Sequence, residues 1–380
     1  MEIKPEVYIV SAVRTASGVG KTTGALFPFA PVDLGAFIMN EAVKRANVDP
    51  AWIEDVVWGV VTPLGDQGAN LGRLSALKAG FPVQVPAVTI NRMCGSSQQA
   101  VHFACQAILA GDMDLVMAGG TEMMSHQVIG SDWPKEWPVD FPYAMVHQGI
   151  SAEMMAEKWA IKREELDDFA YQSHLRAMQA IQKGYFQNQV LPLTRADGVT
   201  ISQDEGVRMP PDRVKMGNLK PVFKLDGVVT AANASQVSDA SAGLVLASEK
   251  AIKQYNLVPR ARVVARGVAG SDPVLMLDAP IPATRTILKR AGLVIGNMDV
   301  IEINEAFASV VLAWSRELEP DMKRVNPNGG GIALGHPLGA TGAVLMTKLL
   351  YELERTNGRY GLQTMCIGHG MATATILERM

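Results

Sequence analysis

Cys94 is the residue of this sequence best placed to act as a nucleophile. It lies in Asn91-Arg92-Met93-Cys94-Gly95-Ser96-Ser97, after an apolar run typical of a strand and before an amphipathic run typical of a helix. A thiol at a helix N-terminus faces unpaired N–H groups and the positive end of the helix dipole, which favour the thiolate. Considered alone, Cys94 also fits an inert core thiol. Cys105, on the apolar face of the same helix, is assigned to the core.

His336 is the candidate general base, in the glycine-rich segment 326–342 between Gly335 and Pro337. Glycine at this density indicates sharp backbone turns and close approach by another group. A side chain on such a stiff backbone suits proton transfer. The alternative is a glycine loop that packs a helix against a sheet, with His336 incidental.

A second thiol and an amide complete the candidate set. Cys366 lies in a glycine turn, Cys366-Ile367-Gly368-His369-Gly370, and Asn304 begins Asn304-Glu305-Ala306-Phe307 at a strand-to-helix junction. Asn304 also fits a simple helix N-cap. Thiols and histidine are zinc ligands too, but there is no CxxC pair and the residues are far apart in the chain. We therefore predict no metal site, and we expect the thiols to act as nucleophile and proton donor.

The elements that must position these residues alternate in type, which is typical of α/β proteins. Expected strands cover 7–13, 55–61, 87–91, 115–118, 244–248, 262–269 and 300–304, with two more and a turn in 365–377. Expected helices cover 33–46, 98–109, 162–183, 306–318 and 342–355.

Two parts of the chain echo one another. Lys44-Arg45-Ala46 leads to a strand beginning at Asp55, and Lys289-Arg290-Ala291 leads to one beginning at Asp299. Cys94 follows Asp55 by 39 residues and His336 follows Asp299 by 37, each in a turn before a helix. This indicates two similar halves. If they pack about a pseudo-twofold axis, Cys94 and His336 meet near its centre.

The segment between the halves has a different character, with loop-like stretches rich in tryptophan and proline. We predict an N-terminal half of residues 1–120 and 237–264, an inserted loop domain of 121–236, and a C-terminal half of 265–380.

Composition narrows the classes of function. The 380 residues carry a net charge of −3, without the basic footprint of a nucleic-acid-binding protein, and no apolar run is long enough to span a membrane. Met1–Pro5 leads directly into a strand-like run, so no signal peptide is expected. Three cysteines indicate free thiols in a reducing compartment, and the C-terminus lacks the Ser-Lys-Leu peroxisomal address. We predict a cytoplasmic protein.

In combination, the Cys94 segment, Asn304-Glu305-Ala306-Phe307, Gly335-His336-Pro337 and Cys366-Ile367-Gly368 resemble the thiolase family of acyl-CoA C-acyltransferases, along essentially the whole chain. The resemblance implies an α/β fold in which two similar halves form a five-layered αβαβα core with an inserted loop domain. It also implies acyl transfer by condensation of acetyl-CoA or thiolysis of 3-ketoacyl-CoA. The implied assembly is a homodimer or a dimer of dimers, that is, a homotetramer.

The resemblance also assigns catalytic roles. Cys94 carries the acyl group as a thioester and His336 removes its proton. Cys366 acts as acid or base in the carbon–carbon step. Asn304 holds a water that, with His336, stabilises the enolate, and the N–H groups of Cys94 and Gly368 form the oxyanion hole.

Coenzyme A is expected as substrate and product, with no tightly bound cofactor. The basic run Arg208, Arg213, Lys215, Lys220 and Lys224 suits its phosphates, and the alternative is an ordinary solvated loop. Lys220 occupies a position that is often basic in the family, Ser235 a position on the pantetheine arm, and His147 a position near the thioester. His369, Ala372, Ser97 and Gln148 depart from the common pattern and leave acyl preference open.

Two other functions compete with this prediction. A ketoacyl-synthase-like enzyme uses a cysteine with two histidines, whereas Cys366 stands here in place of the second base. A non-catalytic CoA- or lipid-binding relative has no need of a nucleophile, and a subunit that depends on a partner would be inactive alone and rescued by a second protein. The sequence chooses neither the direction of reaction nor the acyl chain length.

Overall fold

The structure is a computed structural model and describes residues 5–380. Met1–Lys4, which enter the expectation of no signal peptide, lie outside the described residues. In residues 5–380 no helix combines the length and apolar character needed to cross a membrane.

The N-terminal half is a mixed sheet with helices on both faces. Its strand order is β4-β3-β5-β9-β1, in which β3 is parallel to β4 and β5 while β9 is antiparallel to β5 and β1. The strands are β1 (Val7–Thr15), β3 (Asp55–Gly59), β4 (Ala87–Ile90), β5 (Leu115–Met123) and β9 (Ser238–Ser248). The helices are α1 (Pro31–Ala46), α2 (Leu71–Lys78), α3 (Ser96–Ala110) and α7 (Glu249–Tyr255).

The C-terminal half repeats this order. β11, β12, β13 and β10 follow one another, and an isolated parallel bridge from Ile301 to Val325 stands where β4 stands in the first half. The strands are β10 (Ala261–Gly270), β11 (Val300–Ile303), β12 (Tyr360–Ile367) and β13 (Met371–Arg379). The helices are α8 (Pro280–Ala291), α9 (Ala308–Leu318), α10 (Gly331–Leu334) and α11 (Thr341–Thr356). The matching order, directions and helix positions confirm the predicted two halves.

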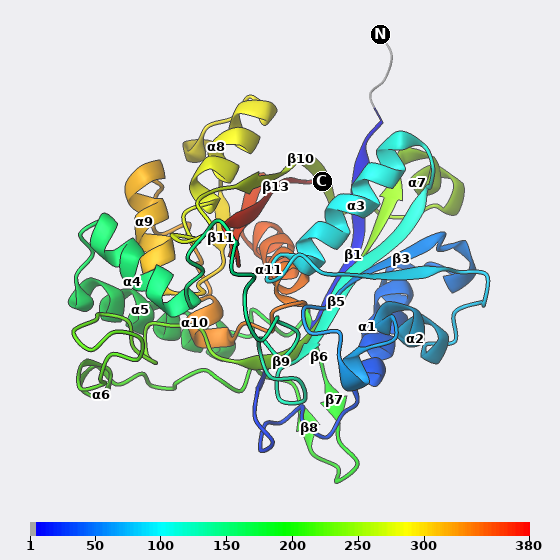
Figure 1. The fold of residues 1–380 in the computed structure, drawn as a ribbon. Coiled ribbons are helices and arrows are strands. Elements are labelled where there is room, and N and C mark those ends of the chain that lie inside the picture. Colours follow the sequence, from blue (N-terminus) through cyan, green and yellow to red (C-terminus); the bar gives the residue numbers. More distant parts are fainter. Residues whose placement is uncertain (1–4) are drawn as a thin grey trace.

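The layers of the described residues run helix, sheet, helix, sheet, helix (Figure 1). α3 and α11 pack against each other in the middle, and their apolar faces meet strands of both halves in one core cluster. A second cluster joins α1 and α2 to the N-terminal sheet, and a third joins α8 and α9 to the C-terminal sheet. The five-layered α/β prediction is confirmed.

The sheets of the two halves join edge to edge. β1 pairs antiparallel with β10 at Tyr8–Arg262 and Ile9–Ala261. β10 crosses the predicted boundary at residue 264 and pairs with β13 along its length. The domain division remains a prediction, and this pairing favours a C-terminal half that begins at or before Ala261.

The inserted segment between β5 and β9 contacts both halves. α4 (Gln148–Lys158) and α5 (Arg163–Gln182) pack on α9, and α5 also contacts α10 and α6 (Arg213–Gly217). β6 (Val190–Leu191) adds to β1 in parallel, while β7 (Leu193–Thr194) and β8 (Thr200–Ile201) pair with each other. Near the first strand, β2 (Gly18–Val19) pairs with the start of β9. Through the contacts of α4 and α5 with α9 and α10, helices α4–α6 lie beside the C-terminal half in Figure 1.

Candidate active site

Cys94 lies in the turn between β4 and α3. Met93 adopts a left-handed φ of 46°, and α3 begins at Ser96. The Cys94 side chain is buried in an apolar cluster of Val61, Met124, Leu338, Met365 and Ile367. Met365 and Ile367 come from β12 of the C-terminal half, whereas Val61 and Met124 come from loops that follow β3 and β5, so both halves contribute residues around this thiol. The sequence assigned the thiol to a helix N-terminus, and the structure places it two residues before the helix.

Burial dominates the acidity of Cys94. Desolvation raises the pKa of its thiol to about 11, and this exceeds the opposing effect of the Gly368 and Cys94 backbone N–H groups at the sulfur. The Glu122 carboxylate raises the pKa further. The expectation that the helix terminus would favour the thiolate is thus wrong for the resting protein, because burial penalises the charged form more strongly than the N–H groups stabilise it.

His336 lies in the loop before α11 and is hydrogen-bonded to the first residue of that helix. Its Nδ1 is 2.7 Å from Thr341 Oγ1, and the Thr341 hydroxyl donates to the Pro337 carbonyl at 2.8 Å. Because that hydroxyl has only one proton, its oxygen must accept from Nδ1–H, which leaves Nε2 as the bare nitrogen. Gly335 precedes with a φ of 97°, and a Cβ there would lie 2.2 Å from Ser238 Oγ, so this turn requires glycine.

The imidazole of His336 is neutral at physiological pH. Burial lowers its pKa to about 4, with no nearby charge among the causes. A buried neutral imidazole with an unprotonated Nε2 is a proton acceptor ready for use.

Asn304 directs its amide toward that bare nitrogen. Nδ2 lies 3.2 Å from His336 Nε2, and Asn304 is fully buried just after β11. The next residue, Glu305, accepts from Ser173 and Asn326 and so fixes the turn against the inserted segment. Asn304 is therefore not a helix N-cap, because α9 begins only at Ala308 after Phe307.

Cys366 and Gly368 bring the β12–β13 hairpin to the same place. Cys366 is buried at the end of β12, where desolvation and the nearby Cys94 raise the pKa of its thiol. The Gly368 N–H is close enough to the Cys94 sulfur to lower the pKa of that thiol, against the larger effect of burial. Cys94, Cys366 and Gly368 thus lie together, and Leu338 of the Cys94 cluster belongs to the loop that carries His336, whose imidazole contacts Asn304.

Glu122 is a site neighbour that the sequence analysis missed. Its buried carboxylate accepts from the backbone N–H groups of Val61, Thr62 and Gly339 and from the Gln67 side chain. Burial raises its pKa to about 7 despite these donors. It joins the loop after β3 to the His336 loop. The available signal was a carboxylate inside the apolar run of β5.

Three residues predicted to contact CoA lie on one side of the site. Ser235 donates its N–H to the Ala306 carbonyl, and its neighbour Ala234 bridges to Phe307. His147 caps α4 and stacks on Phe223 at 5.0 Å between ring centroids. Lys220 lies farther along the loop and is exposed.

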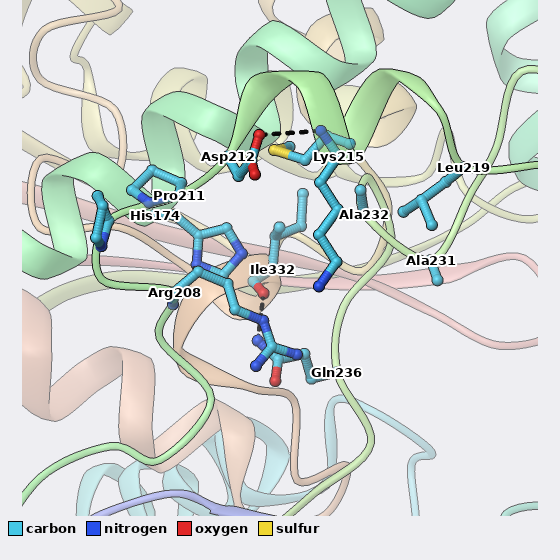
Figure 2. A pocket seen from close by; sticks show the side chains of 12 residues that line it. His174, Arg208, Pro211, Asp212, Lys215, Leu219, Ala231, Ala232, Gln236 and Ile332 are labelled. Atoms are coloured by element: carbon cyan, nitrogen blue, oxygen red, sulfur yellow. Dashed lines mark hydrogen bonds between the residues drawn. The ribbon is translucent and has the colours of Figure 1, made fainter.

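A pocket of about 490 Å³ opens beside this segment. Figure 2 shows the Arg208 and Lys215 side chains reaching into it, near Ala231, Ala232 and Gln236. Of the other residues in the basic run, Arg213 pairs with Asp168 at 2.6 Å and Lys224 lines a different groove. The structure thus singles out Arg208 and Lys215.

Two departures from the common family pattern have distinct surroundings. The Ser97 hydroxyl is buried and accepts from the Ala343 N–H of α11, so it joins the central helices. Gln148 lies at the start of α4, with Nε2 3.0 Å from where a Cβ on Gly368 would stand. Within residues 5–380, no three His, Cys, Asp or Glu side chains are grouped to hold a metal ion.

Comparison with known proteins identifies the family. Residues 7–250 match the thiolase N-terminal domain and 257–379 the thiolase C-terminal domain. The chain is 46% identical to a steroid 3-ketoacyl-CoA thiolase of Mycobacterium tuberculosis, covering 100% of this chain and 95% of the relative. It is 42% identical to a beta-ketothiolase of Cupriavidus necator, covering 99% of each.

A solved structure agrees. The acetyl-CoA acetyltransferase of Bacillus anthracis superposes with a TM-score of 0.92 at 38% identity, covering 100% of both chains. With two matched halves, two thiols, an imidazole and an amide at one centre, and relatives aligned along the whole chain, this protein belongs to the thiolase family of acyltransferases.

Proposed function

We propose that Cys94 is acylated during thiolase turnover and that His336, Cys366 and Asn304 move and position the protons. The observation that supports this most strongly is the Cys94 sulfur itself, which lies against the N–H groups of Cys94 and Gly368 and beside a second thiol. The core thiol Cys105 also has its own N–H beside the sulfur, but neither a donor from a distant segment nor a second thiol is among the causes of its pKa shift.

In thiolysis, His336 Nε2 takes the Cys94 proton as the sulfur attacks the 3-keto carbon. The Cys94 and Gly368 N–H groups stabilise the resulting oxyanion; loss of one such donor typically costs about 3–4 kcal/mol of activation free energy. The C2–C3 bond then breaks, Cys366 protonates the acetyl-CoA enolate, and Cys94 keeps the acyl group. After acetyl-CoA leaves, His336 gives up its proton and Cys366 is reprotonated, so both groups are neutral again. The thiol of a second CoA then loses its proton to His336 and attacks the thioester, and His336 passes that proton to the departing Cys94 sulfur. Condensation follows the same steps in reverse.

CoA lies along the inserted segment in this proposal. Arg208 and Lys215 hold its phosphates in the 490 Å³ pocket, because guanidinium and ammonium groups suit phosphate oxygens. The pantetheine arm passes Ser235 and the stacked His147 and Phe223 toward Cys94. Lys220, exposed at the rim, attracts the nucleotide rather than enclosing it.

Thiolysis of acetoacetyl-CoA by the purified chain with free CoA tests this proposal. The reaction is monitored by the loss of ketoester absorbance. Cys94→Ala should abolish cleavage and acyl-enzyme formation, detected by the mass of the intact protein. Cys105→Ala is the matched control, since that thiol lies in the central core on α3. An acylated Cys94→Ala protein would refute the assignment. Greater activity on carrier-protein thioesters would favour the ketoacyl-synthase-like alternative.

Self-association is the second part of the proposal. β4 ends the sheet, and Val88 on it is 42% exposed, with Val83 at 69% and Leu74 and Leu77 each at 41% nearby. A free strand edge with apolar side chains is a template for another chain, so a second copy covers this edge. The cytoplasmic location and the choice between dimer and tetramer remain predictions.

The relatives differ in the acyl group that their names indicate. They are named steroid 3-ketoacyl-CoA thiolase, beta-ketothiolase and beta-ketoadipyl-CoA thiolase. Substrate preference therefore has to come from this chain's own residues around Cys94.

A further inference from the structure

Residues 125–147 form a long connection, and the residues that flank it, Met124 and Gln148, lie close to Cys94 or to its neighbour Gly368. The segment leaves β5 at Met124, which packs in the apolar cluster of Cys94. It returns through His147 to Gln148, whose amide faces Gly368. Both ends of this connection therefore lie beside the thiol that the proposed function acylates.

Two tryptophans in the middle of this connection contact the imidazole ring of His369. The rings of Trp133 and Trp137 lie 5.6 and 5.8 Å from the His369 ring, tilted at 48° and 90° to it. Trp137 also packs on Phe141 at 5.0 Å. We call residues 130–143 the aromatic loop.

The aromatic loop has few other attachments. The hydrogen bonds recorded for it among the described residues are short-range turns, such as Trp133 N–H to Gly130 and Phe141 N–H to Pro138. Its charged residues Asp132, Lys135, Glu136 and Asp140 form no ion pair within residues 5–380. Ring contacts with His369 therefore connect the loop to the β12–β13 turn.

His369 is directly bonded to the oxyanion donor. It follows Gly368 in the β12–β13 turn and has a left-handed φ of 65°. That conformation favours glycine, so a histidine is retained there at a steric cost that its side chain must offset. Contact of the His369 ring with two tryptophan rings is a stabilising interaction that offsets this steric cost.

The surfaces beneath the loop are apolar and adaptable. Met93, Met124 and Met371 lie in or against the Cys94 cluster. Methionine fills irregular spaces around varied apolar groups, and flat indole rings add broad apolar walls. This lining suits acyl groups larger than the acetoacetyl group.

We propose that His369 is a specificity-determining residue, which anchors the aromatic loop as the outer wall of the acyl site and so favours 3-ketoacyl-CoAs with an extended or ring-bearing apolar acyl group. The proposal rests on the proposed function of Cys94. His369 acts through Trp133 and Trp137 and transfers no proton.

His369→Gly tests the proposal, because glycine fits the positive φ and removes the anchor. The measured quantities are kcat and KM for thiolysis of 3-ketodecanoyl-CoA and acetoacetyl-CoA. We expect kcat/KM for 3-ketodecanoyl-CoA, divided by kcat/KM for acetoacetyl-CoA, to fall about tenfold. Small changes in an apolar pocket typically alter such ratios by about 10–200-fold. The fall should come mainly from a higher KM for 3-ketodecanoyl-CoA. Trp133→Ala combined with Trp137→Ala should reproduce the change. Val139→Ser, on the same loop but fully exposed, is the control that leaves the ratio unchanged.

A second readout does not depend on activity. Lys135 lies between the two tryptophans, so faster tryptic cleavage after Lys135 in His369→Gly, followed by mass spectrometry, reports release of the loop. An unchanged ratio with unchanged cleavage would overturn the proposal, as would loop release with an unchanged ratio. If the wild-type chain cleaved neither thioester, the proposed function would fail and this inference with it, an outcome distinct from a failure of His369 alone.

Discussion

At the scale of single residues, the Cys94 thiol and the His336 imidazole are both uncharged in the resting protein. The Cys94 thiol has a pKa raised to about 11 and the His336 imidazole a pKa lowered to about 4, both through burial. A preformed thiolate–imidazolium pair is therefore disfavoured in the resting protein. Proton transfer must accompany attack on the thioester, when the N–H groups of Cys94 and Gly368 gain an oxyanion to stabilise.

Alkylation of Cys94 by iodoacetamide checks this state. Because only the thiolate reacts and a raised pKa leaves roughly one thiol in ten thousand ionised at pH 7, the rate should rise about tenfold for each pH unit from 7 to 9. An ordinary cysteine peptide levels off near its pKa of about 8.5. Mass spectrometry of the Cys94 peptide measures the rate, and a plateau below pH 8 would contradict a neutral resting thiol.

At the scale of elements, the contact between α3 and α11 brings the two halves together at the site. The helices approach so closely that a Cβ on Gly342 would lie 2.3 Å from the Gln98 backbone nitrogen. The Ser97 hydroxyl accepts the Ala343 N–H at 2.9 Å across the same contact. Cys94 precedes one helix and His336 the other, so their separation depends on this crossing.

Gly342→Ala should therefore both destabilise the fold and impair turnover. Overpacking of a core typically costs about 1–3 kcal/mol, and here the contact is with backbone, which yields little. Urea unfolding measures the change in free energy of unfolding, and thiolysis measures kcat. Gly296→Ala is the control, since a Cβ there meets nothing within 4 Å. Equal stability of the two variants would show that the helices are not constrained at this point.

At the scale of the whole molecule, the edge at β4 links the fold to its assembly. β1, at the opposite side of the N-terminal sheet, is paired with β10, whereas β4 pairs with β3 alone among residues 5–380. The exposed Val88 on this edge is thus the apolar surface that association would bury.

Val88→Lys should shift the protein toward monomer, because burying an unpaired ammonium in an apolar interface is unfavourable and lysine is a common protection of free strand edges. Light scattering coupled to size-exclusion chromatography measures the mass. Val258→Lys, 75% exposed on the connection before β10, is the matched control. If Val88→Lys keeps the wild-type mass, the copies associate through another surface.

The sequence alone determined the chemistry and the repeat. Thiol, imidazole and amide types are readable directly, and the echo between residues 44–94 and 289–336 reflects local βα patterns that apolar periodicity encodes. The predicted strands lie on observed strands with ends shifted by a few residues, as at β9, which begins at Ser238 rather than at 244. Such ends depend on pairing partners that a local pattern does not contain.

Tertiary structure alone decided the electrostatics and the surroundings of the site. A helix terminus favours a thiolate, yet burial by residues from both halves reverses that preference for Cys94. Glu122 became a support for the His336 loop only because Gly339, 217 positions away, donates to it. His369 gained its tryptophan neighbours from a loop more than 200 residues earlier in the chain. Desolvation and long-range contact arise from the packing of distant segments, and no spacing within one segment records them.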